Sequence, residues 1–257
     1  MYYIIQKNVF RDPRYDEVFN VMEELNLEYE QVAFEPNSIK FNFKTTRKDI
    51  FVYGSVKLAK VTAGFNWHPG SFYGGNHAFE EYSKGYGHHA LNHGSYICQI
   101  GDKINWTKTS SLFIKPSKDA KVFTGKVFNQ AEWEDFVYRS LNTSQNARLT
   151  TSTHIQVSAP YRLIKEARIW IVGGKVVTSS YYRFHGNIEF EEHVAIDGLE
   201  FAQKMAAQYH VADAYVMDIG LTYDGWKVVE VNCINSAGFY KGNVKKIIGA
   251  LERFYAH

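Results

Sequence analysis

Two carboxylates and one amide near the end of this 257-residue chain could bind a metal ion. Asp218 is followed by Glu230 twelve residues later and by Asn232 two residues after that. Carboxylates that converge on one face repel one another unless a cation lies among them, and hard oxygen ligands favour Mg²⁺ or Mn²⁺ over zinc. A site for a magnesium-bound nucleotide is the first hypothesis. The alternative is a surface hairpin whose acidic side chains face water.

A β-hairpin is expected to bring these side chains together. The runs 214–220 and 226–231 are rich in β-branched and aromatic residues, and Asp224-Gly225 between them is typical of a tight turn. With the turn centred near Asp224, Asp218 falls opposite Glu230. Asn232 then lies on the same face, because side chains alternate along a strand.

Two lysines occupy strand-like runs upstream. Lys115 ends an apolar run and Lys126 follows a Thr-Gly break in the next run. A lysine beside bulky hydrophobic residues is costly unless an anion such as a triphosphate compensates its desolvation. The alternative for each is a solvated surface lysine.

Glu166, Arg168 and Arg183 could also contact an anion. Glu166 and Arg168 are two residues apart on one expected strand, and Arg183 ends the next. The planar guanidinium suits phosphate or carboxylate, so the two arginines could hold a transferred phosphoryl group or an acyl phosphate. An ordinary cross-strand Glu–Arg pair is the alternative.

The composition is that of a folded protein without a strong charge bias. With 29 basic and 27 acidic side chains the net charge is +2, which gives no global attraction to nucleic acid or an anionic membrane. No apolar run is long enough to span a membrane, and the first residues do not resemble a leader peptide. Cys98 and Cys233 are far apart and in no metal-ligand spacing, which suits a reducing compartment better than a disulfide scaffold. A cytoplasmic protein is expected.

The elements that must position these residues are expected to alternate between strands and helices. In the first hundred residues we expect three strands, a helix after Asp12-Pro13 and a short helix from Gly54-Ser55 to Lys60; the strands are 2–6, 29–34 and 50–53. Residues 64–97 show no clean period and are expected to be an ordered, functional loop. Further along, we expect three helices: one that begins at Gln130, one over about 197–209 and one over about 241–255. The strands expected there are 111–116, 121–128, 153–157, 162–172 and 175–183.

The order of these elements over about residues 106–242 resembles the ATP-grasp superfamily. The phrases FIKP, EAR, SSYYR, and VEVN followed by SAGFY look like its small branch, often encoded by phages or bacteria and distinguished by arginine and lysine residues. The resemblance implies an α+β or α/β fold in which two α+β lobes clamp ATP behind a small α/β domain. The implied domains are 1–105 (pre-ATP-grasp), 106–160 (small lobe) and 161–257 (large lobe with the metal site).

The resemblance also implies roles for the residues named above. Lys115 and Lys126 would contact the α- and β-phosphates or the adenine, and Glu166 would reach the ribose or the hinge side of the pocket. The hinge that binds the adenine edge would comprise Gln156, Val157 and Ser158. The ligands of Mg²⁺ would be Asp218, Glu230 and Asn232. Arg168 and Arg183 would stabilise the phosphoryl and acyl-phosphate charge.

The implied reaction is carboxylate–amine ligation with ATP, through an acyl phosphate. A phosphotransferase on the same fold and a non-catalytic nucleotide-binding module are the alternatives. The chain departs from the family in having no long glycine-rich loop between the lysine strands. A small-molecule or peptide carboxylate and an amine are the expected substrates; nucleic acid is not favoured by charge, and a homo-oligomer remains open.

Two further groups of residues are substrate candidates. Asn235, Ser236 and Tyr240 follow the expected metal ligands, with a loop that caps the last helix as the alternative. The segment Asn66-Trp67-His68 and some of the nearby histidines are expected to line the substrate entrance. The nearby histidines are His77, His88, His89 and His93. A zinc site is the lesser alternative for them, because no acidic or cysteine partner completes it. Cys233 is expected to be buried rather than nucleophilic.

Overall fold

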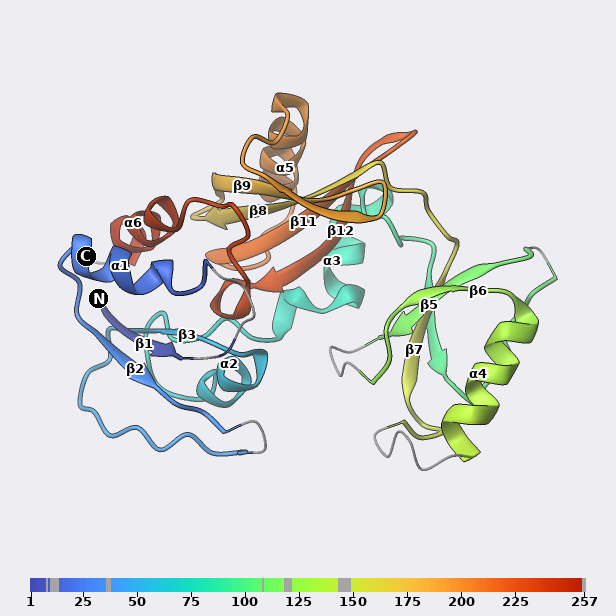
Figure 1. Cartoon of the computed structure of the whole chain (residues 1–257), viewed down its shortest axis with the longest axis horizontal. Coiled ribbons are helices and arrows are strands. Elements are labelled where there is room, and N and C mark those ends of the chain that lie inside the picture. Colours follow the sequence, from blue (N-terminus) through green and yellow to red (C-terminus); the bar gives the residue numbers. More distant parts are fainter. Residues whose placement is uncertain are drawn as a thin grey trace. The chain divides into compact units, whose positions relative to one another are not determined.

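The computed structural model describes residues 1–7, 9, 14–35, 38–107, 109–117, 122–142 and 149–255. The chain divides into two compact units (Figure 1). Unit 1 comprises Met1–Leu91 and Leu163–His257, and unit 2 comprises Asn92–Arg162. The three predicted domains stay a prediction. In the part of the chain that the structure describes, every helix is too short or too polar to cross a lipid bilayer.

Unit 1 begins with a small parallel sheet in the order β2-β1-β3. Its strands are β1 (Tyr2–Gln6), β2 (Tyr29–Val32) and β3 (Ile50–Tyr53). The helices after β1 and β3 are α1 (Glu17–Glu24) and α2 (Val56–Thr62). Ser55 caps α2 by accepting a hydrogen bond from the Leu58 backbone N–H at 3.2 Å, so the predicted start of this helix is confirmed. The helix cap predicted at Asp12-Pro13 lies outside the described residues.

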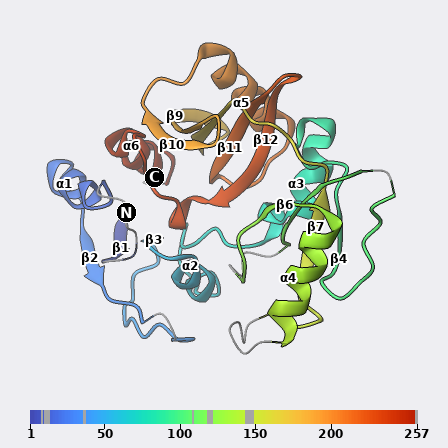
Figure 2. The same ribbon diagram turned by 45° about the vertical axis from the view of Figure 1, so that its right-hand side comes forward.

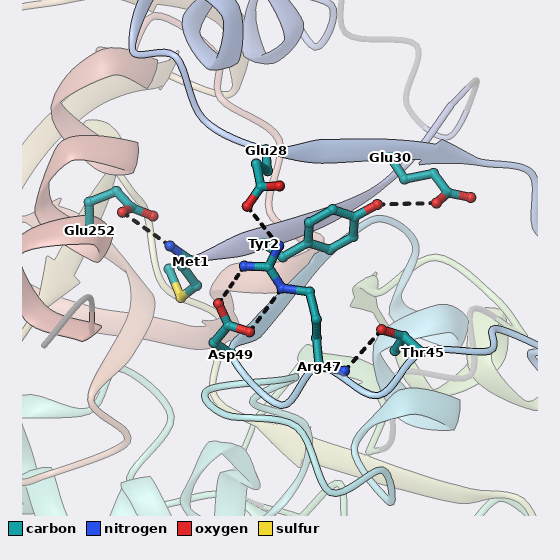
Figure 3. A network of polar contacts seen from close by, with 8 residues as sticks. All are labelled: Met1, Tyr2, Glu28, Glu30, Thr45, Arg47, Asp49 and Glu252. Carbon is teal, nitrogen blue, oxygen red and sulfur yellow. Dashed lines mark hydrogen bonds and ion pairs between the residues drawn. The ribbon is translucent and has the colours of Figure 1, made fainter.

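An ionic network lies where the three strands of this sheet begin (Figure 3). Arg47 donates through Nε and Nη2 to the Asp49 carboxylate at 3.0 and 2.7 Å, and through Nη1 to Glu28 at 2.7 Å. Its guanidinium also lies 4.8 Å from the centre of the Tyr2 ring. These contacts join β1 to the segments that flank it in the sheet, although such partly solvated pairs contribute little stability individually.

A five-stranded antiparallel sheet forms the rest of unit 1, in the order β10-β9-β8-β11-β12. Its strands are β8 (Lys165–Val172), β9 (Lys175–Phe184), β10 (Asn187–Glu191), β11 (Ala214–Thr222) and β12 (Gly225–Cys233). The hairpins β8–β9 and β11–β12 were predicted. Strand β10 was not, because its sequence, NIEFE, is mostly polar and every residue is exposed.

The two faces of this sheet have different coverings (Figure 1). One face packs Ile169 and Met217 in a core with residues of α3 (Phe79–Tyr86) and α5 (Ile196–Gln208). The other packs Trp170 and Val216 in a core with residues of α6 (Val244–Tyr255). Because side chains alternate, Arg168 lies on the same face as Trp170. This second face therefore changes from apolar to charged along the strands.

The segment 64–97 is not the irregular loop that the sequence predicts. It contains α3 between two short 3₁₀ helices, η1 (Gly75–His77) and η2 (Gly87–His89), and it ends in β4 (Tyr96–Gln99). The buried residues of α3 are Tyr82, Ser83 and Tyr86, a set without aliphatic side chains that hides the helical period. Beyond η2, the Leu91 N–H donates to the Val228 carbonyl at 2.8 Å, so this segment covers part of the edge of β12.

Unit 2 is a four-stranded antiparallel sheet in the order β4-β7-β5-β6. The further strands are β5 (Leu112–Pro116), β6 (Lys126–Phe128) and β7 (His154–Ser158). Helix α4 (Gln130–Asn142) runs along this sheet (Figure 2) and buries Trp133 in a core with Ile114, Phe128 and Val157. Among the described residues β6 is shorter than predicted, and Lys121 lies outside them.

Candidate active site

The β11–β12 hairpin places Asp218 directly opposite Glu230, so the predicted pair is confirmed. A bulge at Val229 produces this pairing, since Ile219 pairs with Val228 and Asp218 with Glu230. Without the extra residue, a regular ladder counted from the turn would place Val229 opposite Asp218 and Glu230 on the other face. The bulge therefore lets Val228 stay in the core while Glu230 faces Asp218.

Asn232 joins the two carboxylates. Its Nδ2 donates to Asp218 Oδ2 at 3.3 Å and to Glu230 Oε1 at 3.1 Å. Within the described ranges no three His, Cys, Asp or Glu side chains are grouped so that they could hold a metal ion, so the set is limited to two carboxylates and an amide. Mg²⁺ is usually held by one or two carboxylates together with substrate phosphates and water. The two carboxylates fit a metal that is shared with a nucleotide, and Asn232 presents its Nδ2 to both of them.

Arg168 pairs with Asp218 across the β8–β11 ladder. Its Nε donates to Oδ1 and its Nη2 to Oδ2, both at 2.9 Å. Only 1% of Asp218 and 9% of Arg168 is exposed. Burial raises the pKa of Asp218 to about 6; the nearby guanidinium opposes this shift, and Glu230 adds to it. Sequence reasoning missed the pair because it gives no order for strands separated by fifty residues.

Glu166 holds the second arginine. Arg183 Nη1 donates to Glu166 Oε1 at 3.0 Å, and the Tyr182 hydroxyl donates to Oε2 at 3.0 Å. The two arginines thus contact different carboxylates, and the cross-strand Glu–Arg alternative describes the pair at Glu166. The Arg183 side chain is 41% exposed, which leaves part of it accessible to a ligand. Tyr182 was not predicted, although its place beside Arg183 on a strand near charged residues was the available signal.

The loop after β12 separates its three predicted substrate residues. Tyr240 lies with its ring 4.6 Å from the Arg168 guanidinium carbon. The Ser236 hydroxyl donates to the Cys233 carbonyl at 3.4 Å and is half-buried. Cys233 itself is buried as predicted, and burial raises the pKa of its thiol to about 11.

The Asn235 side chain makes hydrogen bonds to backbone groups inside unit 1. It is fully buried, and its Nδ2 donates to the carbonyls of Val52 and Gly70 at 2.6 and 3.0 Å. Its Oδ1 accepts from the Phe72 N–H at 2.8 Å. The carboxamide joins β3 to the segment that follows α2, and its donors and acceptor are used within unit 1. These contacts are structural, but they are made to Val52, Gly70 and Phe72 and not to the last helix, so they differ from the predicted helix cap.

In unit 2 the two predicted lysines lie on opposite faces of the sheet. Lys115 pairs with Gln156 across the β5–β7 ladder, whereas Lys126 pairs with Ile114 across β5–β6. Cross-strand partners share a face and neighbours along a strand alternate, so Lys126 is on the face of the buried Ile114 and Lys115 on the other. The Lys126 ammonium lies 4.7 Å from the centre of the Phe128 ring.

The predicted hinge residues lie in a central strand. Gln156 and Val157 pair with both β4 and β5, so their backbone belongs to two ladders. Val157 is fully buried, and the Ser158 hydroxyl is 3.5 Å from the Phe113 carbonyl. Gln156 Nε2 donates to Ser95 Oγ at 2.8 Å, and within the described residues its buried Oε1 has no hydrogen-bond partner. An adenine-binding role for this strand stays a prediction.

The other predicted entrance residues are spread over unit 1, except for His93, which lies in unit 2. Trp67 packs edge-on against Phe65 and Phe43, beside the parallel sheet. The rings of His88 and His89 are 4.0 Å apart. Burial lowers the pKa of His77, although a contact with the Gly74 carbonyl opposes this shift. Their roles at a substrate entrance stay predictions.

Comparison with known proteins identifies a family model over most of the chain. Residues 50–251 match the model described as ATP-grasp domain, R-2-K clade family 3. A search of curated proteins by sequence finds no match.

Solved structures of low sequence identity share the fold. D-cycloserine synthetase DcsG is 10% identical, with a TM-score of 0.64 over 99% of this chain and 100% of that one. The ATP-grasp ligase PsnB in complex with minimal precursor, Mg and ADP is 10% identical, with a TM-score of 0.61 over 100% of this chain and 98% of that one. D-alanine–D-alanine ligase from Bacillus anthracis is 13% identical, with a TM-score of 0.58 over 100% of this chain and 94% of that one.

Proposed function

The chain belongs to family 3 of the R-2-K clade of ATP-grasp domains, and on this premise we propose that it is an ATP-dependent ligase that joins a carboxylate to an amine. The observation that carries the proposal is the convergence of Asp218, Glu230 and Asn232 beside a buried arginine on one sheet face. A site rich in both carboxylates and guanidinium groups suits a reaction that brings negative charges together. The ligase structures of similar fold support the same reading.

The charges on this face support a bound cation. Three carboxylates, those of Glu166, Asp218 and Glu230, are accompanied by two guanidinium groups, those of Arg168 and Arg183. Mg²⁺ or Mn²⁺ would be held by Asp218 and Glu230, and by Asn232 once its carboxamide turns so that Oδ1 replaces Nδ2 between the two carboxylates. Each carboxylate oxygen has two lone pairs, so Asp218 can accept from Arg168 and also serve as a ligand. A metal bound there would neutralise phosphate charge.

Unit 2 would supply groups for the nucleotide. The Lys115 face of its sheet also carries Gln156, whose buried oxygen has no partner within the described residues and would accept a hydrogen bond from a ligand. We propose that Lys115 contacts the phosphates. Lys126, on the opposite face and over Phe128, would make the lesser contribution.

The proposed reaction has two steps. A substrate carboxylate oxygen attacks the γ-phosphorus of ATP, and ADP leaves to give an acyl phosphate. The amine nitrogen then attacks the acyl carbon, phosphate leaves, and the nitrogen gives up a proton as the amide forms. Arg168 and Arg183 would stabilise the phosphoryl charge in both steps. PsnB has also been solved with a precursor peptide, and this likeness supports a peptide carboxylate as the substrate class that we propose.

Trapping with hydroxylamine tests this proposal. The protein is incubated with ATP, Mg²⁺ and a panel of amino acids and peptides, and hydroxamate and ADP are measured. An acyl phosphate gives hydroxamate in proportion to ADP. A stable phosphoester with no hydroxamate would instead establish the phosphotransferase alternative, and ATP binding without ADP release with any acceptor would establish a non-catalytic module.

A further inference from the structure

Hydrogen bonds to Asp218 and to the Gly238 carbonyl hold the Arg168 guanidinium along its edge. Asp218 on β11 accepts from Nε and Nη2, both at 2.9 Å, and the Gly238 carbonyl accepts from Nη1 at 3.4 Å. A guanidinium has five N–H groups, so, counting the hydrogen bonds among the described residues, one remains on each terminal nitrogen for a ligand. The direction of these two groups depends on whether the guanidinium can tilt out of its plane.

Tyr240 covers the face of this guanidinium. The guanidinium carbon of Arg168 lies 4.6 Å from the centre of the ring, within cation–π distance. Tyr240 has a φ of +49°, a left-handed conformation that is unfavourable for a tyrosine. The surrounding packing must therefore hold the ring in place.

Two further aromatic rings supply that packing. Phe190 on β10 stacks on the Tyr240 ring at 5.2 Å with an interplanar angle of 21°, and Tyr182 on β9 lies at 5.4 Å and 32°. Tyr182 is itself fixed, because its hydroxyl donates to Glu166. The rings thus connect the exposed edge strand of the sheet to the buried arginine.

We propose that Tyr240 is a positioning residue, whose ring, backed by Phe190, holds Arg168 so that its two remaining N–H groups meet the γ-phosphate. This inference rests on the proposed function. In this proposal the ring of Tyr240 orients Arg168, whereas the sequence predicted that Tyr240 contacts the substrate directly. A guanidinium held on its edge and its face is preorganised, so it loses little conformational freedom when it binds an anion.

The test compares nucleotides with and without the γ-phosphate. Calorimetry measures the dissociation constants of Mg·AMPPNP and Mg·ADP for the wild type, Tyr240→Leu, Tyr240→Phe and the control Tyr223→Leu, an exposed turn residue. Loss of a desolvated cation–π contact should weaken AMPPNP binding about tenfold in Tyr240→Leu and leave ADP binding unchanged. Tyr240→Phe keeps the ring and should retain the preference for AMPPNP.

A second variant covers the possibility that Tyr240→Leu does not fold. Phe190 is 41% exposed on an edge strand, so Phe190→Leu should fold, and it should weaken AMPPNP binding in the same direction but less. In both variants, hydrogen exchange of the Arg168 Nε–H, measured by NMR without nucleotide, should be faster than in the wild type.

Three outcomes would overturn the inference. An equal loss in Tyr240→Phe would assign the role to the hydroxyl and restore the predicted ligand contact. Unchanged AMPPNP binding and Nε–H exchange in the folded leucine variants would show that the rings do not position Arg168. Failure of the wild type to bind either nucleotide would remove the proposed function and this inference with it.

Discussion

Unit 1 gathers the charged residues predicted on β8, β9, β11 and β12 on one sheet face, whereas unit 2 divides its two lysines between opposite faces. Both use antiparallel sheets, so the difference comes from register. In unit 1, Asp218 is opposite Arg168 on one side and, through the bulge, opposite Glu230 on the other. In unit 2, Lys126 is opposite Ile114 rather than Lys115. A one-residue difference in pairing decides whether side chains meet or separate.

The largest effect is expected from removing Asp218. Asp218→Ala leaves the buried Arg168 without its carboxylate, which should lower the free energy of unfolding by about 3–5 kcal/mol and abolish Mg²⁺-dependent ATP turnover. Urea denaturation and ADP release measure the two effects. The matched control is Asp224→Ala in the exposed turn of the same hairpin, which should behave like the wild type. Equal stability of the two variants would argue against a tightly coupled ionic face in unit 1.

Glu230→Gln separates metal binding from stability. The substitution keeps the size and removes a charge without breaking the Arg168 pair, so the protein should stay close to wild-type stability. Turnover of ATP should fall about 100-fold, since even indirect changes at metal sites cost 10–100-fold. Titration with Mg²⁺ and Mn²⁺ after chelation measures the loss. Full activity without a higher metal requirement would contradict the assignment of this carboxylate.

The two lysines test the division seen in unit 2. Lys115→Met should weaken ATP binding roughly tenfold, because a hydrogen bond to a charged group contributes about 1.5–3 kcal/mol. Lys126→Met should weaken it only about twofold, as for an exposed charge. Calorimetric titration with Mg·ATP analogue compares them. Equal losses would mean that opposite faces of the sheet do not separate their roles.

The smallest expected effect is a pH dependence of the stability of unit 1 that arises from His77. Burial lowers the pKa of His77 below its ordinary value of 6.5, so the unfolded chain takes up a proton more readily than the folded protein. The stability present above pH 6.5 should therefore decrease as the pH falls below it. Unfolding curves at about pH 7.5 and 5.5 should show a smaller decrease in His77→Gln than in the wild type or in the exposed control His193→Gln. An identical decrease in all three would exclude His77 as its source.

Much of the fold could be predicted from local patterns. The first three strands, the Ser55 cap and the β8–β9 and β11–β12 hairpins follow from residue alternation and turn chemistry, which act over a few residues. Helix α3 was not predicted because its buried residues are tyrosines and a serine. Strand β10 was not predicted because all its residues are exposed. Their positions depend on the segments they pack against.

The sequence by itself determined the β11–β12 hairpin and placed Asp218, Glu230 and Asn232 on its two strands, because Asp224-Gly225 specifies a tight turn within one short segment. The bulge at Val229, which brings Glu230 to the face of Asp218, was seen only in the structure. Only the tertiary structure decided that Arg168 pairs with Asp218, that Tyr240 covers that arginine, and that Lys115 and Lys126 face opposite ways. These contacts depend on sheet order, bulges and the packing of segments distant in the sequence. No pattern within a single strand specifies them.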